Sequence, residues 1–280
     1  MRTLVLILAG LMLLPPFATA QPRPARPAAP QEMAYGRDPL QRLDFWRGRG
    51  PAAPLVVFVH GGGWRGGDKE WIGAATPAHF LNQGYAYASV NYRLVPAVNV
   101  EQQTQDVADA VAFLLSRAEQ LGVERRKILL IGHSSGGHNS ALIATDPRFL
   151  KKSGLDPSVL GGVVLLEGAG LVPRQGQGGG GPGMIGPELS PANHTAKPNA
   201  DSFVMLIATS EDLGRQAAVL ANALRAAGTP ARIENIPNSG HNELVGNLGE
   251  PGDRATQVVD DAARQAFAFR VGQGQGAQVR

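Results

Sequence analysis

The sequence of 280 residues contains no cysteine. This absence excludes a disulfide framework, so the stability of the fold must come from its hydrophobic core. It also excludes a cysteine nucleophile and any metal site built on thiolates. The six histidines form neither an H-E-x-x-H pattern nor another paired spacing that predicts a zinc site. The sequence therefore indicates no metal and no other cofactor.

The sequence also lacks a large excess of charge of either sign. The chain carries 26 basic and 23 acidic residues, and the basic residues are scattered along it. A basic stripe with interleaved aromatic residues is the footprint of nucleic-acid binding, so no nucleic-acid partner is predicted. The length and the hydrophobic share of 43% suit a globular protein with a buried core. They favour one α/β domain over two small ones.

The apolar run at the N-terminus is short. Residues 4–14 follow the positively charged Arg2, are broken by two prolines, and lead to the A-T-A tripeptide at 18–20. These are the three parts of a secretory signal peptide, whereas a membrane-spanning helix needs about 20 apolar residues. We therefore expect a signal peptide over 1–20 and a secreted or periplasmic protein without stable membrane insertion. A retained helix that tethers the protein to the membrane is the alternative.

The rest of the chain divides into a leader, one domain and a tail. Residues 21–33 are rich in proline and carry no foldable hydrophobic pattern, so they predict an extended leader. The domain is expected over 34–270, and the glycine-rich residues 271–280 predict a flexible tail. Within the domain, residues 171–198 contain a run of four glycines and predict a mobile loop.

Strand and helix patterns alternate through the domain. Short runs rich in β-branched residues predict strands at 55–59, 85–90, 127–131, 163–167, 203–208 and 231–236, with a leading antiparallel strand at 41–47. Apolar residues at spacings of three and four predict helices at 101–120, 217–227 and 256–269. Strands that alternate with helices indicate an α/β fold with a mostly parallel sheet flanked by helices.

The stretch I-G-H-S-S-G-G-H at 131–138 holds a G-x-S-x-G motif whose central serine is Ser134. It follows a predicted strand and precedes a helical pattern, which is the context of a nucleophile elbow. The sharp turn requires small flanking residues, and Gly132 and Gly136 meet that requirement. On its own the motif is also compatible with an ordinary turn between a strand and a helix.

A second motif strengthens the interpretation of Ser134 as a nucleophile. His60 and three glycines directly follow the predicted strand at 55–59, and such a loop is a typical oxyanion hole of esterases and lipases. Gly62 and Gly63 are the expected N–H donors, with the N–H of Ser135 as the third. Trp64 and His60 are expected to hold the loop in place and are tentative substrate contacts. A flexible glycine loop without function is the alternative.

The general base is expected to be His241. It lies in a turn after the last predicted strand, and in this fold the chain order is serine, acid, histidine. His133 and His138 lie beside Ser134 in the sequence and are expected to be structural. His194, beyond the glycine run, is compatible with a substrate contact or with no role.

The orienting acid is predicted at the end of the strand at 203–208, in the sequence T-S-E-D. Asp212 precedes His241 by enough residues for one helix and one strand. Glu211 is its direct neighbour and stays an alternative. We prefer Asp212, because aspartate is the commoner third member of such triads.

Together these motifs resemble the α/β-hydrolase esterases of bacteria. The segments Y-G-R-D-P-L-Q-R-L-D-F-W, H-G-G-G-W-R-G-G-D-K, G-Y-A-Y-A-S-V-N-Y-R-L, G-H-S-S-G-G-H and G-H-N-E-L are similar to the group related to bacterial feruloyl and acetyl-xylan esterases. Wider similarity extends to the hormone-sensitive-lipase branch and to kynurenine formamidases. The resemblance covers nearly the whole domain. It implies Ser134, His241, Gly62 and Gly63 as site residues, whereas the S-E-D-L-G turn at Asp212 is atypical of the group.

The resemblance implies a serine hydrolase that cleaves a small-molecule carboxylic ester through an acyl-enzyme on Ser134. Only about thirty residues lie between the expected signal peptide and the predicted strand at 55–59 that precedes the H-G-G-G motif. We therefore expect no large cap domain. An open pocket edged by Trp64 and the 171–198 loop would favour short or moderate acyl groups, including aryl or sugar esters. An arylformamidase-like amide hydrolase and a catalytically inactive binding protein on the same fold are the alternatives.

Overall fold

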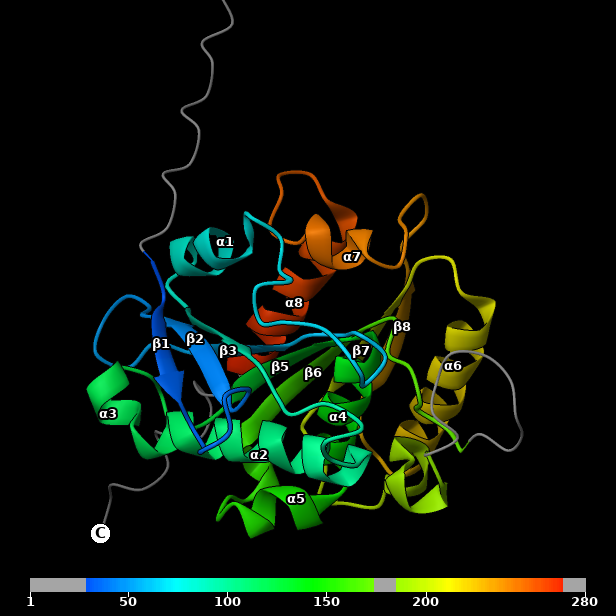
Figure 1. Cartoon of the computed structure of the whole chain (residues 1–280). Helices are drawn as coiled ribbons and strands as arrows, with labels where there is room; N and C mark the ends of the chain where they lie inside the picture. The colour runs from blue at the N-terminus through cyan, green and yellow to red at the C-terminus, as the bar shows by residue number, and fades with distance from the viewer. Residues whose placement is uncertain (1–28, 174–184, 269–280) are drawn as a thin grey trace, which may run out of the picture.

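A computed structural model of the chain describes residues 29–173 and 185–268 (Figure 1). The predicted signal peptide at 1–20, most of the predicted leader and the predicted tail at 271–280 lie outside the described residues. Among the described residues, no helix is long and apolar enough to cross a lipid bilayer.

Within the described residues, eight strands form one central sheet (Figure 1). Their spatial order is β1-β2-β4-β3-β5-β6-β7-β8. The β2 strand runs antiparallel to β1 and β4, and all other pairs from β4 to β8 are parallel. The bounds are β1 Gln31–Ala34, β2 Arg42–Trp46, β3 Leu55–Val59, β4 Ala86–Val90, β5 Ile128–His133, β6 Leu160–Leu166, β7 Phe203–Ile207 and β8 Ala231–Asn235.

Helices cover both faces of this sheet (Figure 1). Residues of α2, α4 and α6 contribute to the hydrophobic cluster on one face, and residues of α1 and α8 to the cluster on the other. The bounds are α1 Thr76–Asn82, α2 Val100–Ser116, α3 Ala118–Leu121, α4 Ser134–Thr145, α5 Pro147–Lys152, α6 Glu211–Ala226, α7 Glu243–Gly246 and α8 Arg254–Ala268. The part of the chain that the structure describes also contains 3₁₀ helices at Pro157–Val159, Pro187–Leu189 and Pro191–Asn193.

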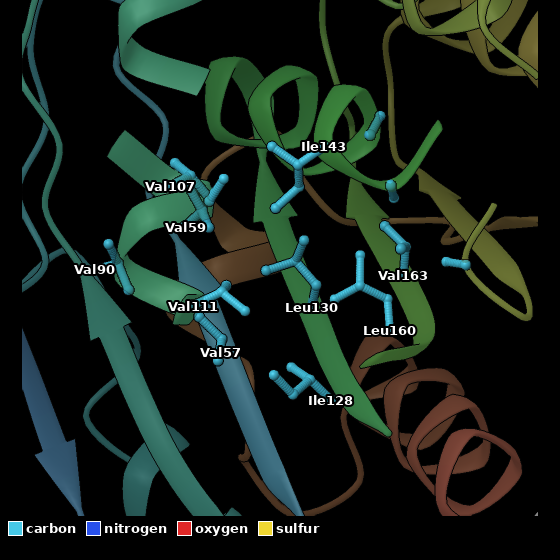
Figure 2. Packing of buried hydrophobic residues seen from close by; sticks show 14 of the residues in the cluster. Val57, Val59, Val90, Val107, Val111, Ile128, Leu130, Ile143, Leu160 and Val163 are labelled. Carbon is cyan, nitrogen blue, oxygen red and sulfur yellow. The ribbon is translucent and has the colours of Figure 1, made fainter. Parts of the chain in front are cut away.

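Successive side chains of each central strand point to opposite faces of the sheet, so each strand contributes to both hydrophobic clusters. Val57 and Val59 of β3 point to the face covered by α2 and α4, where Figure 2 shows them beside Val107 and Val111 of α2. Val56 and Phe58 belong to the cluster on the opposite face. Both faces are therefore apolar, as is expected for parallel strands buried on both sides.

The α/β fold with a mostly parallel sheet is confirmed, and each predicted strand corresponds to a strand of the sheet. Within the described residues, no cap domain is inserted between the strands. The helix predicted at 101–120 divides into α2 and α3 at Arg117, whose backbone leaves the helical region.

Two predicted irregular segments differ from the structure. Residues 31–33 of the predicted leader belong to β1, because their backbone pairs with the edge of β2, although their side chains stay largely exposed. In the loop predicted at 171–198, residues 174–184 lie outside the described residues. Residues 185–198 contain two 3₁₀ helices, and the second of them, Pro191–Asn193, packs against α4 and α6. Packing against these helices explains the order that the local glycine content did not predict.

Candidate active site

Ser134 occupies a strained turn between β5 and α4. Its φ is +52°, in the left-handed region that residues with a side chain seldom adopt. It is the first residue of α4, so it lies at the positive end of that helix. Its carbonyl oxygen accepts a hydrogen bond of 2.9 Å from the N–H of Ala169, just after β6. Such strain is typical of functional sites, and it supports the predicted nucleophile elbow.

Gly136 allows the elbow to approach the H-G-G-G loop. A Cβ atom on Gly136 would lie 2.2 Å from the carbonyl oxygen of His60 and 2.3 Å from that of Val59. A Cβ atom on Gly61 would lie 3.0 Å from the Cβ of Ser134. The two motifs, more than seventy residues apart in the sequence, are therefore in direct backbone contact.

The H-G-G-G loop turns tightly after Gly61. Gly62 has a φ of +125°, and its carbonyl oxygen accepts hydrogen bonds from the N–H groups of Arg65 and Gly66. Any side chain on Gly62 would collide with the carbonyl of Gly66 at 2.1 Å, whereas Gly63 faces open space. The turn thus depends on glycine for both its backbone angles and its packing.

Three N–H groups are available for an oxyanion. Across residues 29–173 and 185–268, no group accepts a hydrogen bond from the backbone N–H of Gly62, Gly63 or Ser135. Donors of this kind, held in place before a reaction, stabilise the negative oxygen of a tetrahedral intermediate. The arrangement is compatible with the predicted oxyanion hole.

The side chains of Trp64 and His60 are buried. The Trp64 side chain is 5% exposed and packs with Val95, Val100 and Ile185. The His60 ring is buried, stacks on Tyr92 at 4.4 Å, and contacts the carbonyl of Gly61 through Nδ1. Both rings thus turn into the core and support the loop, as expected, and their tentative assignment as substrate contacts stays a prediction.

His241 is held by a buried carboxylate, and this carboxylate belongs to Glu167. The Nδ1 atom of His241 lies 2.6 Å from Oε2 of Glu167. The other oxygen of Glu167 accepts three hydrogen bonds of 3.0 Å from the N–H groups of Ala208, Thr209 and Ser210. Because Nδ1 faces an acceptor, Nε2 of the neutral ring is free to take a proton.

The environment of Glu167 keeps its carboxylate charged. Its side chain is completely buried, and burial alone would raise the pKa. The hydrogen bonds from Ser210, His241, Thr209 and Ala208 outweigh burial and hold the pKa of Glu167 below its usual value. Its φ of +44° is also in the left-handed region. Glu167 thus joins Ser134 among the few residues with strained backbone.

The carboxylate that contacts Nδ1 of His241 is that of Glu167 and not that of Asp212, so the prediction of Asp212 as the acid is wrong. Ser210 caps α6, so Asp212 lies in the first turn of that helix. Its carboxylate accepts a hydrogen bond from Gln216 and pairs with Arg215. Glu211 is 93% exposed and also pairs with Arg215. The turn after β7 instead contributes its backbone N–H groups to Glu167.

The sequence contained one signal for Glu167. It ends the apolar run V-V-L-L-E of a predicted core strand, where a charged residue needs a partner. The sheet register supplies the rest: His133 of β5 pairs with Leu166 of β6, so Ser134 and Glu167 follow at the same edge. The chain order serine, acid, histidine is kept with this residue.

His133 positions His241 from beneath. Its Nε2 donates a hydrogen bond of 3.0 Å to the carbonyl oxygen of His241, and the two ring centroids are 4.5 Å apart. Because His133 directly precedes Ser134, this contact places the His241 turn next to the elbow. Among the described residues, Ser134 Oγ makes no hydrogen bond to His241. Catalytic pairs commonly close such gaps when substrate binds.

The titration of His133 makes the free energy of unfolding depend on pH. Burial, and then the neighbouring His241, lowers the pKa of His133 to about 4, from 6.5 in an unfolded chain. Between these values the unfolded state binds more protons than the native state, so stability is lost as the pH falls. The difference corresponds to about 3 kcal/mol.

We expect His133→Gln to remove this dependence. The stability advantage of the natural chain over the variant should shrink by up to about 3 kcal/mol between pH 7 and pH 4. Urea unfolding of both proteins at several pH values measures the difference. An advantage that stays constant over this range would contradict a neutral, buried His133.

The remaining histidines near the motifs have structural partners. His138 is buried, and its Nε2 donates to the carbonyl of Leu189 at 2.8 Å, as its predicted structural role requires. His194 contacts the carbonyl of Glu188 and lies 3.8 Å from Asp146. Across the described residues, no three His, Asp or Glu side chains are grouped to hold a metal ion.

A cavity of about 290 Å³ opens beside the elbow. Gly61 and His133 belong to its wall, together with Trp71, Ile72, Asn242, Val245 and Gly246. The wall thus combines the segment after the H-G-G-G loop with the segment after His241. The predicted edge at Trp64 is not part of it.

Comparison with known proteins relates the chain to esterases. The family model described as BD-FAE matches residues 46–155. Esterase LipC of Mycobacterium tuberculosis is 34% identical over 137 residues, which cover 46% of this chain and 34% of that protein. The chain spans about a third or less of the first curated relatives that it matches. Ethyl acetate hydrolase of Pseudomonas putida is 26% identical, covering 76% of this chain and 74% of that enzyme.

Solved structures agree with the fold. A truncated form of a carbohydrate esterase from gut microbiota superposes with a TM-score of 0.70 at 20% identity. The superposition covers 87% of this chain and 99% of that one. At this identity the likeness concerns the architecture of sheet and helices.

Proposed function

We propose that the chain is an α/β-hydrolase that hydrolyses carboxylic esters through an acyl-enzyme on Ser134, because the proteins that it matches are esterases and its fold agrees with that of a solved esterase. The observation that carries this proposal is the hydrogen bond between buried Glu167 and His241 at the elbow that presents Ser134. The wider resemblance of the motifs to bacterial esterases supports the same reaction.

In the first half of the reaction, Ser134 Oγ attacks the ester carbonyl while Nε2 of His241 takes its proton. The negative charge on the carbonyl oxygen faces the N–H groups of Gly62, Gly63 and Ser135. Glu167 stays ionised and stabilises the imidazolium through Nδ1. His241 then protonates the alcohol oxygen, and the alcohol leaves.

In the second half, His241 takes a proton from water, and the resulting hydroxide attacks the acyl-enzyme. The same three N–H groups stabilise the second tetrahedral intermediate, and its collapse returns the proton to Ser134. The carboxylic acid is released. No residue beyond these is needed to balance the protons.

Covalent labelling tests this proposal. A fluorophosphonate should label the protein at Ser134, and the same preparation should hydrolyse p-nitrophenyl acetate. Peptide mapping identifies the labelled serine, with Ser135→Ala as a matched variant that keeps the N–H donor. Faster hydrolysis of N-formyl aryl amides than of acetate esters would instead favour the arylformamidase reaction. Failure to label would favour a catalytically inactive binding protein.

We further propose that the mature protein acts outside the cytoplasm, because residues 1–20 have the pattern of a signal peptide. The absence of a cap in the described residues supports an open acyl site and short or moderate acyl groups.

A further inference from the structure

We infer that the 290 Å³ cavity beside the elbow binds the alcohol portion of the ester, and that Trp71 selects uncharged alcohols with a flat apolar ring. The chemical class is that of phenol or benzyl alcohol. This inference rests on the proposed ester hydrolysis, and it adds which portion of the ester occupies the cavity.

The position of the cavity assigns it to the alcohol. A general acid must lie within hydrogen-bond reach of the oxygen that it protonates. Asn242, Val245 and Gly246 form part of the cavity wall; Asn242 directly follows His241 in the chain, and the other two lie in the next turn. The leaving oxygen therefore lies on the side of the site that this wall borders.

The wall on the other side continues the oxyanion loop. Trp71 and Ile72 follow the H-G-G-G motif and line the cavity together with Val245. The two segments are joined near the cavity by a hydrogen bond of 2.6 Å from Thr76 to the carbonyl of Leu248. In Figure 1 α1 and α7, which follow the two segments, lie at the same end of the molecule. The cavity is thus formed by the same two segments that supply the oxyanion donors and the base.

The backbone under Trp71 is firmly anchored. The N–H of Trp71 donates to the carbonyl of Asp68 at 2.9 Å. Asp68 accepts a hydrogen bond from Asn91, and the neighbouring Lys69 forms a buried ion pair of 3.0 Å with Asp44. A buried pair with defined partners fixes the local geometry. Trp71 therefore presents its ring from a fixed support.

The exposure of Trp71 is unusual for an aromatic side chain. It is 60% exposed and is the larger of two large hydrophobic side chains recorded as exposed among the described residues. A tryptophan beside a cavity provides a broad apolar surface, and aromatic rings stack on it with a modest gain in affinity. Because most of its surface is exposed, a substitution of Trp71 should change stability little.

The wall offers little to a sugar or to a charged alcohol. Its side chains are Trp71, Ile72 and Val245, with Asn242 and His133 as the polar members. The Nε2 of His133 already donates to the carbonyl of His241. Several hydroxyl groups would thus lose water without gaining partners, which costs free energy. The volume is near the lower end of small-molecule sites, about 300 Å³, and suits one ring.

The test compares acetate esters that differ only in the alcohol. We expect Trp71→Ala to lower kcat/KM for benzyl acetate about 3- to 10-fold relative to ethyl acetate. Trp71→Phe should restore most of the difference, because it keeps a flat ring. Val219→Ala, at another exposed apolar residue on α6, is the matched control and should leave the ratio unchanged.

Three outcomes would overturn the inference. They are an equal loss for both acetates, a loss that follows the acyl group in a series of ethyl esters, and a larger loss for an acetylated glucoside than for benzyl acetate. The Ser134→Ala variant distinguishes a failure of the subsite assignment from a failure of the proposed ester hydrolysis. If that variant is inactive while the Trp71→Ala ratio is unchanged, the subsite assignment alone fails. If Ser134→Ala keeps its activity, the proposed function fails as well.

Discussion

Ser134→Ala is expected to lower kcat for ester hydrolysis by about 10⁴-fold or more. The alanine removes the only hydroxyl that the elbow presents, while the N–H groups of Gly62, Gly63 and Ser135 remain. These donors and substrate binding should leave a residual rate above that of water by about 10³-fold. Steady-state kinetics with p-nitrophenyl acetate measure the loss.

The neighbouring serine gives the control for this variant. Ser135 is buried, and its expected contribution is its backbone N–H, which alanine also carries. Ser135→Ala should therefore retain most of the activity. A variant at Ser134 that is as active as the one at Ser135 would refute the acyl-enzyme.

Glu167→Gln should have the second-largest effect, a loss in kcat of about 10³- to 10⁴-fold. The amide oxygen can still accept the three N–H groups after β7, so the variant should fold. It can no longer stabilise a positive His241, and its amide N–H₂ disfavours the tautomer that leaves Nε2 free. The expected loss follows from both effects. Kinetics at saturating substrate, with a thermal melt to verify folding, measure it.

Asp212→Asn is the matched control for Glu167→Gln. Asp212 lies on α6, where it contacts Gln216 and Arg215. Removing its charge should change the stability of an exposed helix end slightly and leave kcat nearly unchanged. If Asp212→Asn lost activity while Glu167→Gln kept it, the assignment of the acid to Glu167 would be wrong.

Local patterns were sufficient where local physics determines the structure. The alternation of strands and helices predicted the sheet, because each strand between two helical layers must be apolar on both faces. The G-x-S-x-G and H-G-G-G motifs were also readable, since their glycines satisfy backbone demands within a few residues. The same local reasoning did not predict the 3₁₀ helices within residues 185–198, one of which packs against α4 and α6.

Which carboxylate pairs with His241 depends on how the folded chain brings distant segments together. Asp212 and Glu167 both follow core strands at the same edge of the sheet, and chain order allowed either. Only the folded sheet brings Glu167 to His241 and turns the amides of 208–210 toward its carboxylate. The preference for aspartate gave the wrong residue, because frequency says nothing about which side chain is buried.

The sequence by itself determined the fold class, the strained serine turn and the glycine loop, because each follows from the period of apolar residues or from backbone sterics. The tertiary structure decided the acid, the inward turn of Trp64 and His60, and the cavity at Trp71. These features depend on contacts between segments far apart in the chain, which no short pattern encodes.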